Sequence, residues 1–485
     1  MEKYILHFAE EPLKLNKEEL ENKEKILEYL KDKEQIEIKE NFIFFNNFTG
    51  IFEANNQTYL VISKKLANHF GLIGKNNEPV ENFEEIYNNN FENFLRYILR
   101  ELSKEQIIYS LSLSHFSVEK SRLNKSAILK LLLLLNKKEE IIGSFYLILS
   151  NPHRKLVEYQ SYKNIDEVSY VDSDVIVDIT QNSERLYETS NGILSYQEKK
   201  YSPSTVLQYE TEETFDTLEN RFIKHFLKEL ENILLNELKD FMFLDELQEL
   251  KNEVKNMLQS DIFSEVGDLN YFPSNSQVLM KKSGYREIFQ IYRLLHLSFV
   301  PKIFEDLDMA FSLKDMATLW EYYVLIKILK EFKKVFGNYK IEIDFEERKK
   351  GKTIYDYAKF KFENGLILHF QKTEKSYAEV EFRPDFLIEY NGKSYVFDAK
   401  FRIIKDKDGK FISNVKNDIF KNMHYYKDGL KINSAVAVCL GEDEKGKFWT
   451  INENDKGKDV SSFLEIIKSE ELKGIGYLDL RLEIE

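Results

Sequence analysis

The chain has 485 residues, 43% hydrophobic and 31% charged, a composition typical of a soluble globular protein with two or three domains. Its formal net charge of −14 argues against a protein that coats DNA over its whole surface, so any contact with nucleic acid must be a local patch. The single cysteine, Cys439, lies in an apolar run and indicates a buried thiol in a reducing, cytoplasmic setting. The N-terminus lacks the layout of a signal peptide, and the longest apolar run, residues 131–135, is too short to cross a membrane, so we expect no membrane partner.

The first 80 residues predict a small β-rich region. Their apolar spacing indicates a short strand over residues 4–8 and a charged amphipathic helix over 17–33. Short apolar runs broken by Asn-rich turns then predict a β meander over 35–63.

Residues 81–210 predict a mixed α/β domain. Apolar periodicity indicates helices over residues 82–102 and 125–137. Two apolar runs, 140–149 and 168–179, are interpreted as strands.

A helical connecting section is expected over residues 211–310. Asp216 or Thr217 suits the N-cap of its first long helix. Three polar residues on this helix either contact phosphate or form a solvated face with an internal Arg–Glu pair: Asn220, Arg221 and Lys224.

The last domain is expected over residues 311–485 and begins with a helix over 315–332. Glu321 lies on the apolar stripe of this helix, where a carboxylate is costly unless it is paired or ligating. It is either a third carboxylate of a metal site or a side chain that reaches solvent at the end of the stripe. Strands follow around 339–345 and 366–370.

A β-hairpin is the strongest local signal in the chain. Asn391-Gly392 separates two runs of β-branched and aromatic residues, and this dipeptide suits the positive φ angles of a type I′ turn. Counting outward from the turn sets the expected register: Tyr390 faces Lys393, Ile388 faces Tyr395, and Phe386 faces Phe397.

The same register places Asp385 opposite Asp398, and strand alternation puts Lys400 on their face. Two carboxylates about 5 Å apart repel by about 3 kcal/mol at an effective dielectric near 20. A divalent cation between them would turn repulsion into ligation, because Mg²⁺ prefers carboxylate, water and phosphate oxygens. The spacing therefore predicts a metal-dependent phosphodiesterase site.

Beyond this hairpin the chain turns basic, with nine Lys or Arg against five Asp between residues 398 and 431. Such a patch suits a phosphate backbone. A helix is expected over 415–430, with a buried stripe of Ile419, Met423, Tyr426 and Leu430. Its polar side carries Lys421, His424 and Tyr425; Lys421 and Tyr425 either face a phosphate, or Tyr425 is half-buried packing and Lys421 is solvated.

These motifs carry a resemblance to a known family. Pro384-Asp385, followed by Asp398-Ala399-Lys400, resembles the PD-(D/E)XK nuclease motif, with Glu321 on the helix in front. Between about residues 140 and 440 the chain is similar to McrC-like proteins of prokaryotic restriction systems, including LlaJI-type subunits. The segments that carry this similarity are 217–224, 283–287, 320–321, 398–401 and 418–428.

The resemblance implies an α/β fold class: an α+β N-terminal region, a helical middle, and a C-terminal restriction-endonuclease-like mixed β-sheet flanked by helices. It also implies a DNA endonuclease of a restriction or anti-phage system that uses Mg²⁺ or Mn²⁺. Double-stranded DNA would be the substrate, a McrB-like AAA+ NTPase the partner, and the protein an oligomer.

The resemblance further assigns roles to residues. Metal ligands would be Asp385, Asp398 and Glu321, with the backbone carbonyl of Ala399. Lys400 would orient or help deprotonate the attacking water. Contacts with nucleic acid are expected from the basic segment and the helix behind it: Arg402, Lys421, His424 and Tyr425.

Two other functions stay open. In one, the nuclease-like fold is a non-catalytic adaptor or scaffold of a defence complex; in the other, the nuclease cuts RNA, since metal and phosphate chemistry do not distinguish sugars. An NTPase site of the chain's own is excluded, because in the P-loop-like run 441–448 Phe448 replaces the Ser or Thr that binds Mg²⁺. That run is interpreted as a charged hairpin turn.

Overall fold

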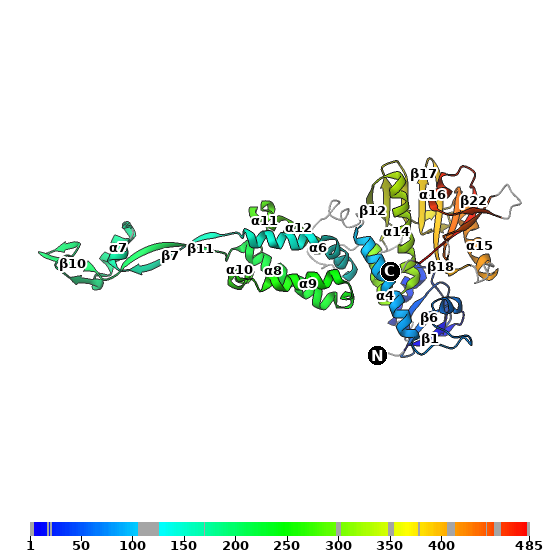
Figure 1. Ribbon diagram of the computed structural model, residues 1–485, viewed down its shortest axis with the longest axis horizontal. Coiled ribbons are helices and arrows are strands. Elements are labelled where there is room, and N and C mark those ends of the chain that lie inside the picture. Colours follow the sequence, from blue (N-terminus) through cyan, green and yellow to red (C-terminus); the bar gives the residue numbers. More distant parts are fainter. Residues whose placement is uncertain are drawn as a thin grey trace. The chain divides into compact units, whose positions relative to one another are not determined.

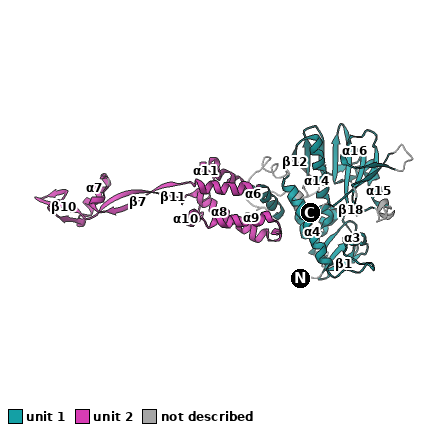
Figure 2. Cartoon of the chain, in the orientation of Figure 1, with its two compact units in different colours: residues 1–136, 294–485 teal, residues 137–293 magenta. Residues whose placement is uncertain are grey.

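The computed structural model describes residues 4–482 except 17–18, 20–21, 105–125, 169, 297–301, 348–353, 377–378, 405–412, 443 and 451–456. The chain forms two compact units, one of residues 1–136 with 294–485 and one of residues 137–293 (Figure 2). The four-part division expected from the sequence stays a prediction. Among the described helices, none is long and apolar enough to span a membrane.

The N-terminal part of the first unit is β-rich, as predicted. Its strands form two three-stranded sheets, β1-β6-β5 and β2-β4-β3, in which β1 runs parallel to β6. The elements are β1 (Ile5–Phe8), β2 (Leu13–Lys14), α2 (Glu24–Asp32), β3 (Ile36–Lys39), β4 (Phe42–Phe45), β5 (Gly50–Ala54) and β6 (Gln57–Ile62). Short helix α3 (Lys64–His69) and long helix α4 (Phe83–Lys104) follow (Figure 1).

The prediction of strands over residues 140–149 and 168–179 is wrong. Residues 140–149 lie inside helix α6 (Ala127–Ser150), because the leucine-rich run before them continues as one long apolar helix, and a short apolar run by itself does not distinguish helix from strand. Most of 168–179 lies in helix α7 (Ser173–Gln181). There Asp172 acts as N-cap, accepting hydrogen bonds of 3.0 Å from the backbone N–H groups of Asp174 and Val175.

The second unit contains a long two-stranded ribbon and a group of helices. Strands β7 (Lys155–Lys163) and β11 (Val206–Thr214) pair antiparallel over nine residues. A small sheet of order β8-β10-β9 lies between them in sequence: β8 (Leu186–Glu188), β9 (Leu194–Tyr196) and β10 (Lys199–Pro203). Besides α7 and most of α6, its helices are α8 (Leu218–Asn232), α9 (Asp245–Leu258), α10 (Asp261–Glu265), α11 (Gln277–Lys281) and α12 (Tyr285–Leu295).

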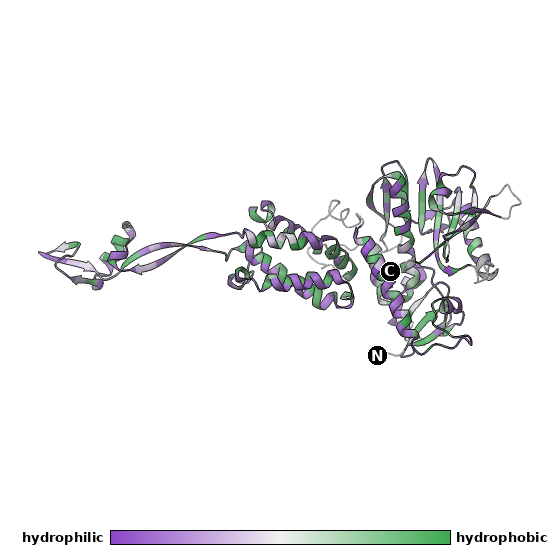
Figure 3. Cartoon of the chain, viewed as in Figure 1, coloured by the Kyte–Doolittle hydropathy of each residue, from purple (hydrophilic) through white to green (hydrophobic). Residues whose placement is uncertain are grey.

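Helix α8 begins as predicted at Thr217, whose hydroxyl accepts a hydrogen bond from the Asn220 backbone N–H. Its polar residues are engaged within the second unit. Asn220 donates to the carbonyls of His153 and Phe215, and Arg221 pairs with Asp216. Helices α8 and α9 carry hydrophobic and hydrophilic segments along their length, as amphipathic helices that share a core do (Figure 3). These contacts favour a structural role for the start of α8 over phosphate binding.

The C-terminal part of the first unit is built on a nine-stranded mixed sheet of order β12-β13-β14-β17-β18-β19-β22-β20-β21. The expected fold class is confirmed. Its strands are β12 (Tyr339–Glu347), β13 (Ile354–Phe362), β14 (Ile367–Phe370), β17 (Phe386–Tyr390), β18 (Lys393–Ile403), β19 (Ser434–Leu440), β20 (Gly446–Thr450), β21 (Lys458–Val460) and β22 (Gly474–Leu480). A separate two-stranded ribbon joins β15 (Glu374–Lys375) and β16 (Glu381–Phe382). The helices are α13 (Lys302–Ser312), α14 (Met316–Phe336), α15 (Ser413–Gly429) and α16 (Phe463–Lys468).

Helices cover both faces of this sheet. On one face, Ile419 and Met423 of α15 pack in a core with Val396 of β18 and Ala437 of β19. On the other face, Phe463 of α16 contacts Phe397, and Trp320 of α14 donates a 3.2 Å hydrogen bond from its ring N–H to the carbonyl of Val438. Alternate residues of β18 therefore face different helices, which places Asp398 and Lys400 on the α15 side.

Candidate active site

The β17–β18 hairpin has the predicted register. Asn391 and Gly392 both have positive φ, 51° and 71°, and the strand pairs are Tyr390 with Lys393, Ile388 with Tyr395, and Phe386 with Phe397. The ladder ends at the last of these pairs. Asp385 and Asp398 are the next residues outward, so the turn alone brings two carboxylates to the same end of the hairpin.

Asp385 is held by the backbone around it. Its Oδ2 accepts a 2.7 Å hydrogen bond from the N–H of Ala399, and its own carbonyl accepts a 2.8 Å bond from the N–H of Gln371. Burial raises the pKa of Asp385 well above its usual range, and the charges of Glu321 and Asp398 raise it further. Asp385 is therefore a half-buried acid near two other carboxylates.

Asp398 is 2% exposed and is contacted on both oxygens. The Lys400 ammonium lies 2.7 Å from Oδ2, and the Tyr426 hydroxyl donates a 3.3 Å hydrogen bond to Oδ1. Burial by itself would lower the pKa of Lys400, but the charges of Asp398 and Asp385 outweigh it and raise that pKa. Lys400 therefore stays a cation beside the two aspartates.

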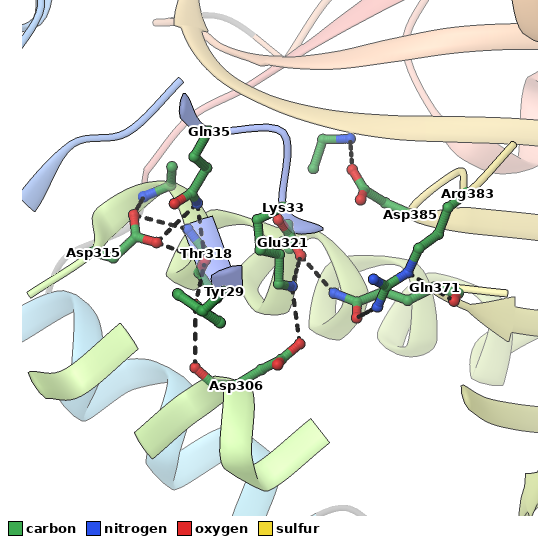
Figure 4. Close-up of polar contacts among 12 residues, drawn as sticks. Tyr29, Lys33, Gln35, Asp306, Asp315, Thr318, Glu321, Gln371, Arg383 and Asp385 are labelled. Atoms are coloured by element: carbon green, nitrogen blue, oxygen red, sulfur yellow. Dashed lines mark hydrogen bonds and ion pairs between the residues drawn. The ribbon is translucent and has the colours of Figure 1, made fainter. Parts of the chain in front are cut away.

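Glu321 approaches the same site from α14. It is 9% exposed, so the interpretation that it reaches solvent is wrong. Its Oε2 accepts hydrogen bonds from Lys33 Nζ at 2.8 Å and from Gln371 Nε2 at 2.6 Å (Figure 4). Glu321 is also the largest charge that acts on the pKa of Asp385. The structure thus brings four residues together: Glu321, Asp385, Asp398 and Lys400. The first and last of these, Glu321 and Lys400, are 79 residues apart in the sequence.

Comparison with known families agrees with this geometry. Residues 318–440, which include the hairpin, the Glu321 helix and α15, match the PD-(D/E)XK nuclease superfamily. Residues 318–440 therefore carry a domain of the PD-(D/E)XK nuclease superfamily. Residues 81–292 match a domain of unknown function, DUF2357. A comparison with curated proteins gave no match.

Two solved structures are similar to the chain. One is a chain of the refined half-complex from the tetradecameric assembly of Thermococcus gammatolerans McrB AAA+ hexamers with bound McrC; the match has 13% identity, covers 99% of this chain and 94% of that chain, and has a TM-score of 0.26. The other comes from the Thermococcus gammatolerans McrBC complex, with 13% identity, coverage of 68% and 88%, and a TM-score of 0.17.

Four residues of this polar network were not anticipated as site residues: Lys33, Gln371, Arg383 and Tyr426. Tyr426 was placed on the buried stripe of its helix, and its ring does pack against Phe382, but its hydroxyl reaches Asp398. Arg383 stands directly before Pro384-Asp385 and could have been noticed for that reason. Its Nη2 donates a 2.9 Å hydrogen bond to Oε1 of Gln371. Nothing near Lys33 in the sequence points to the nuclease domain.

The four residues expected to contact nucleic acid lie outside this polar network. Lys421, His424 and Tyr425 are exposed on α15, and Tyr425 is 63% exposed, which does not fit half-buried packing. Arg402 donates a hydrogen bond from Nη2 to the backbone carbonyl of Asn46 in the N-terminal region. Part of the basic segment after it, residues 405–412, lies outside the described residues.

The donors present suit a hard divalent cation. Asp398 is a buried carboxylate and Asp385 a half-buried one, and Asp398 Oδ2 receives no hydrogen bond of good geometry although the Lys400 ammonium is near it. The Ala399 carbonyl lies between them in sequence and adds an oxygen donor of the type that Mg²⁺ and Mn²⁺ accept. In the part of the chain that the structure describes, no group of three His, Cys, Asp or Glu is already arranged around a common point as ligands. In the structure, Lys400 lies beside Asp398 and Lys33 beside Glu321, so lysine ammonium groups balance the charge of these two carboxylates.

Proposed function

We propose that this protein is a metal-dependent DNA endonuclease of a prokaryotic restriction or anti-phage system. The observation that carries the proposal is the pair of half-buried Asp385 and buried Asp398, with Lys400 beside Asp398, in a domain similar to PD-(D/E)XK nucleases. Buried like charges are costly, and a structural hairpin has no use for them. A site that binds a cation and a phosphate needs such charges.

In this proposal Asp385 and Asp398 hold Mg²⁺ or Mn²⁺, with the Ala399 carbonyl and Glu321 as further oxygen ligands. The bound metal would polarise the phosphate and lower the pKa of a water molecule. The Lys400 ammonium steadies the negative charge that develops on the phosphate during in-line attack. Cleavage would leave 5′-phosphate and 3′-hydroxyl ends.

We extend the proposal to a partner AAA+ NTPase, the kind of protein that McrB is in the assemblies named above. The chain has no P-loop of its own, so any NTP dependence must come from another protein. The second unit also exposes large apolar side chains on its strands, which favour a protein partner there: Leu156, Tyr159, Tyr162, Tyr187 and Tyr196. Replacing Tyr187 and Tyr196 by Ser should abolish co-purification with that ATPase and leave metal binding unchanged.

The nuclease proposal is tested with the purified full chain on plasmid DNA in Mg²⁺, Mn²⁺ or EDTA, with and without a McrB-like AAA+ ATPase. We expect cleavage only with metal, and Asp398→Asn and Lys400→Ala to reduce it by about a hundredfold or more. Lys393→Ala, at the turn end of the same strand, is the matched control and should cleave normally. Unchanged cleavage by Asp398→Asn would contradict the site.

The same experiment separates the other functions. A chain that cuts neither DNA nor RNA under any condition, and whose thermal unfolding does not respond to Mn²⁺, would be the adaptor. Cleavage of RNA in place of DNA would keep the metal site and change the substrate.

A further inference from the structure

The N-terminal region places a buried lysine inside the nuclease domain. Lys33 follows α2, and its side chain is only 5% exposed. Its ammonium lies 2.8 Å from Oε2 of Glu321 and 3.1 Å from Oδ2 of Asp306 (Figure 4). Burial alone would lower the pKa of Lys33, but the charges of Asp306 and Glu321 raise it. The Lys33 ammonium is therefore held between two carboxylates.

The contacts of Lys33 lead to the backbone of Asp385. Glu321 Oε2, which accepts from Lys33, also accepts the 2.6 Å hydrogen bond from Gln371. Gln371 is in turn held by Arg383 through its side chain, and its N–H donates to the carbonyl of Asp385. Within the described part of the chain, only Oε2 of Glu321 is engaged by a donor.

We propose that Lys33 is a positioning residue of the nuclease site. It holds Glu321 by one oxygen and directs the other oxygen toward the metal held by Asp385 and Asp398. This inference rests on the proposed metal-dependent nuclease. It makes the N-terminal region a part of the nuclease site, so a nuclease domain without residues 1–80 would carry a misplaced Glu321.

Docking of the N-terminal region does not depend on Lys33. Two residues later, Gln35 donates hydrogen bonds to Asp315 at 2.8 Å and to Thr318 at 3.1 Å, at the start of α14. Backbone bonds add to this, among them the 2.8 Å bond from the Met316 N–H to the Thr49 carbonyl. Gln35 therefore offers a control: its loss weakens docking and leaves the Glu321 contacts untouched.

Loss of the Lys33 charge has two opposite effects on cation binding. One positive charge fewer would by itself tighten the binding of Mn²⁺. Loss of the Lys33 hydrogen bond to Glu321 leaves that ligand without a fixed orientation. Hydrogen bonds from neighbouring residues to a metal ligand change the metal affinity by about 10- to 100-fold. The sign of the change therefore distinguishes a positioning residue from a competing cation.

The test follows the unfolding temperature of the full chain against Mn²⁺ concentration. For Lys33→Met we expect the half-saturating Mn²⁺ concentration to rise about tenfold or more, while Lys33→Arg and Gln35→Met stay near the parent value. In the Glu321→Gln chain, Lys33→Met should change this concentration little, because a residue that acts through Glu321 has no effect without it. On DNA, kcat at saturating Mn²⁺ should fall about tenfold with KM nearly unchanged.

An unchanged or lower half-saturating concentration in Lys33→Met would overturn the positioning role, and so would an equal change in Gln35→Met. If Lys33→Met does not fold, the double variant Lys33→Met with Asp306→Asn replaces it, because Asp306 is then no longer a carboxylate without its lysine partner. The same rise in half-saturating Mn²⁺ concentration is expected for this double variant. A parent chain that shows no response to Mn²⁺ would instead contradict the proposed nuclease, so the two failures are distinguishable.

Discussion

The hydroxyl of Tyr426 donates a 3.3 Å hydrogen bond to Oδ1 of Asp398, the carboxylate whose other oxygen faces Lys400. Burial raises the pKa of Tyr426 well above its usual range, and the charges of Asp398 and Asp385 add to this. The hydroxyl therefore keeps its proton and remains a donor. Helix α15, on one face of the sheet, thus fixes the side-chain orientation of Asp398 on strand β18.

Replacing Tyr426 by Phe should slow cleavage by about tenfold at saturating metal and DNA, because Asp398 loses the donor that orients it. The cost in stability should be only about 1 kcal/mol, since the ring still packs against Phe382. Single-turnover cleavage and urea unfolding measure the two effects. Tyr390→Phe, which removes a hydroxyl from the same sheet, is the control. A normal cleavage rate in Tyr426→Phe would show that Asp398 does not need this bond.

Asp385→Asn should stabilise the metal-free chain and abolish metal binding. The raised pKa of Asp385 means that its ionised form is unfavourable in the folded state, and an amide removes that cost while its oxygen can still accept from Ala399. We expect a gain of about 1–2 kcal/mol in unfolding free energy without metal and no shift on addition of Mn²⁺. Denaturant melts with and without Mn²⁺ measure both. If Asp385→Asn instead lowers the unfolding free energy of the metal-free chain, the raised pKa of Asp385 is contradicted.

The exposed face of α15 is expected to contact the phosphate backbone. Lys421→Ala should weaken DNA binding and lower the slope of log Kd against log salt concentration by about one, whatever the DNA sequence. The combined change of His424 and Tyr425 to Ala should weaken binding further. Fluorescence anisotropy on an Asp398→Asn background avoids cleavage during the measurement. Kd values and a salt slope equal to those of the parent would place the DNA elsewhere.

A fourth prediction concerns Asp315, the buried N-cap of α14. Burial raises its pKa to about 6. A pKa that is higher in the folded than in the unfolded chain contributes stability below the unfolded value, and this contribution is lost as the pH rises through the folded value. Between pH 5 and pH 7, the parent should lose about 1 kcal/mol more unfolding free energy than Asp315→Asn. The asparagine keeps both capping acceptor bonds. Equal pH dependence of the two chains would contradict the raised pKa.

Local sequence patterns determined much of the nuclease domain. Asn391-Gly392 has positive φ at both positions and sets the register residue by residue, so the meeting of Asp385 and Asp398 follows from the turn alone. Helices α14 and α15 of this domain, and α4 outside it, were predicted for the same kind of reason, since their apolar spacing repeats over several turns. These features depend on residues near one another in the chain.

The predictions failed where apolar runs were short or where partners were distant. Residues 140–149 suit a strand or a helix equally, and the long helix α6 decided between them. The run 441–448 was expected to join two paired strands, but β22 lies between β19 and β20 in the sheet. Sequence order does not reveal such an insertion.

The sequence by itself determined which residues could carry out the chemistry: two aspartates, a lysine and the hairpin that aligns them. Only the tertiary structure decided what surrounds them. Lys33 meets Glu321 across 288 residues, and Tyr426 meets Asp398 from another element. No local pattern encodes these contacts, because they arise when separate elements are packed against one sheet and their buried charges must find partners.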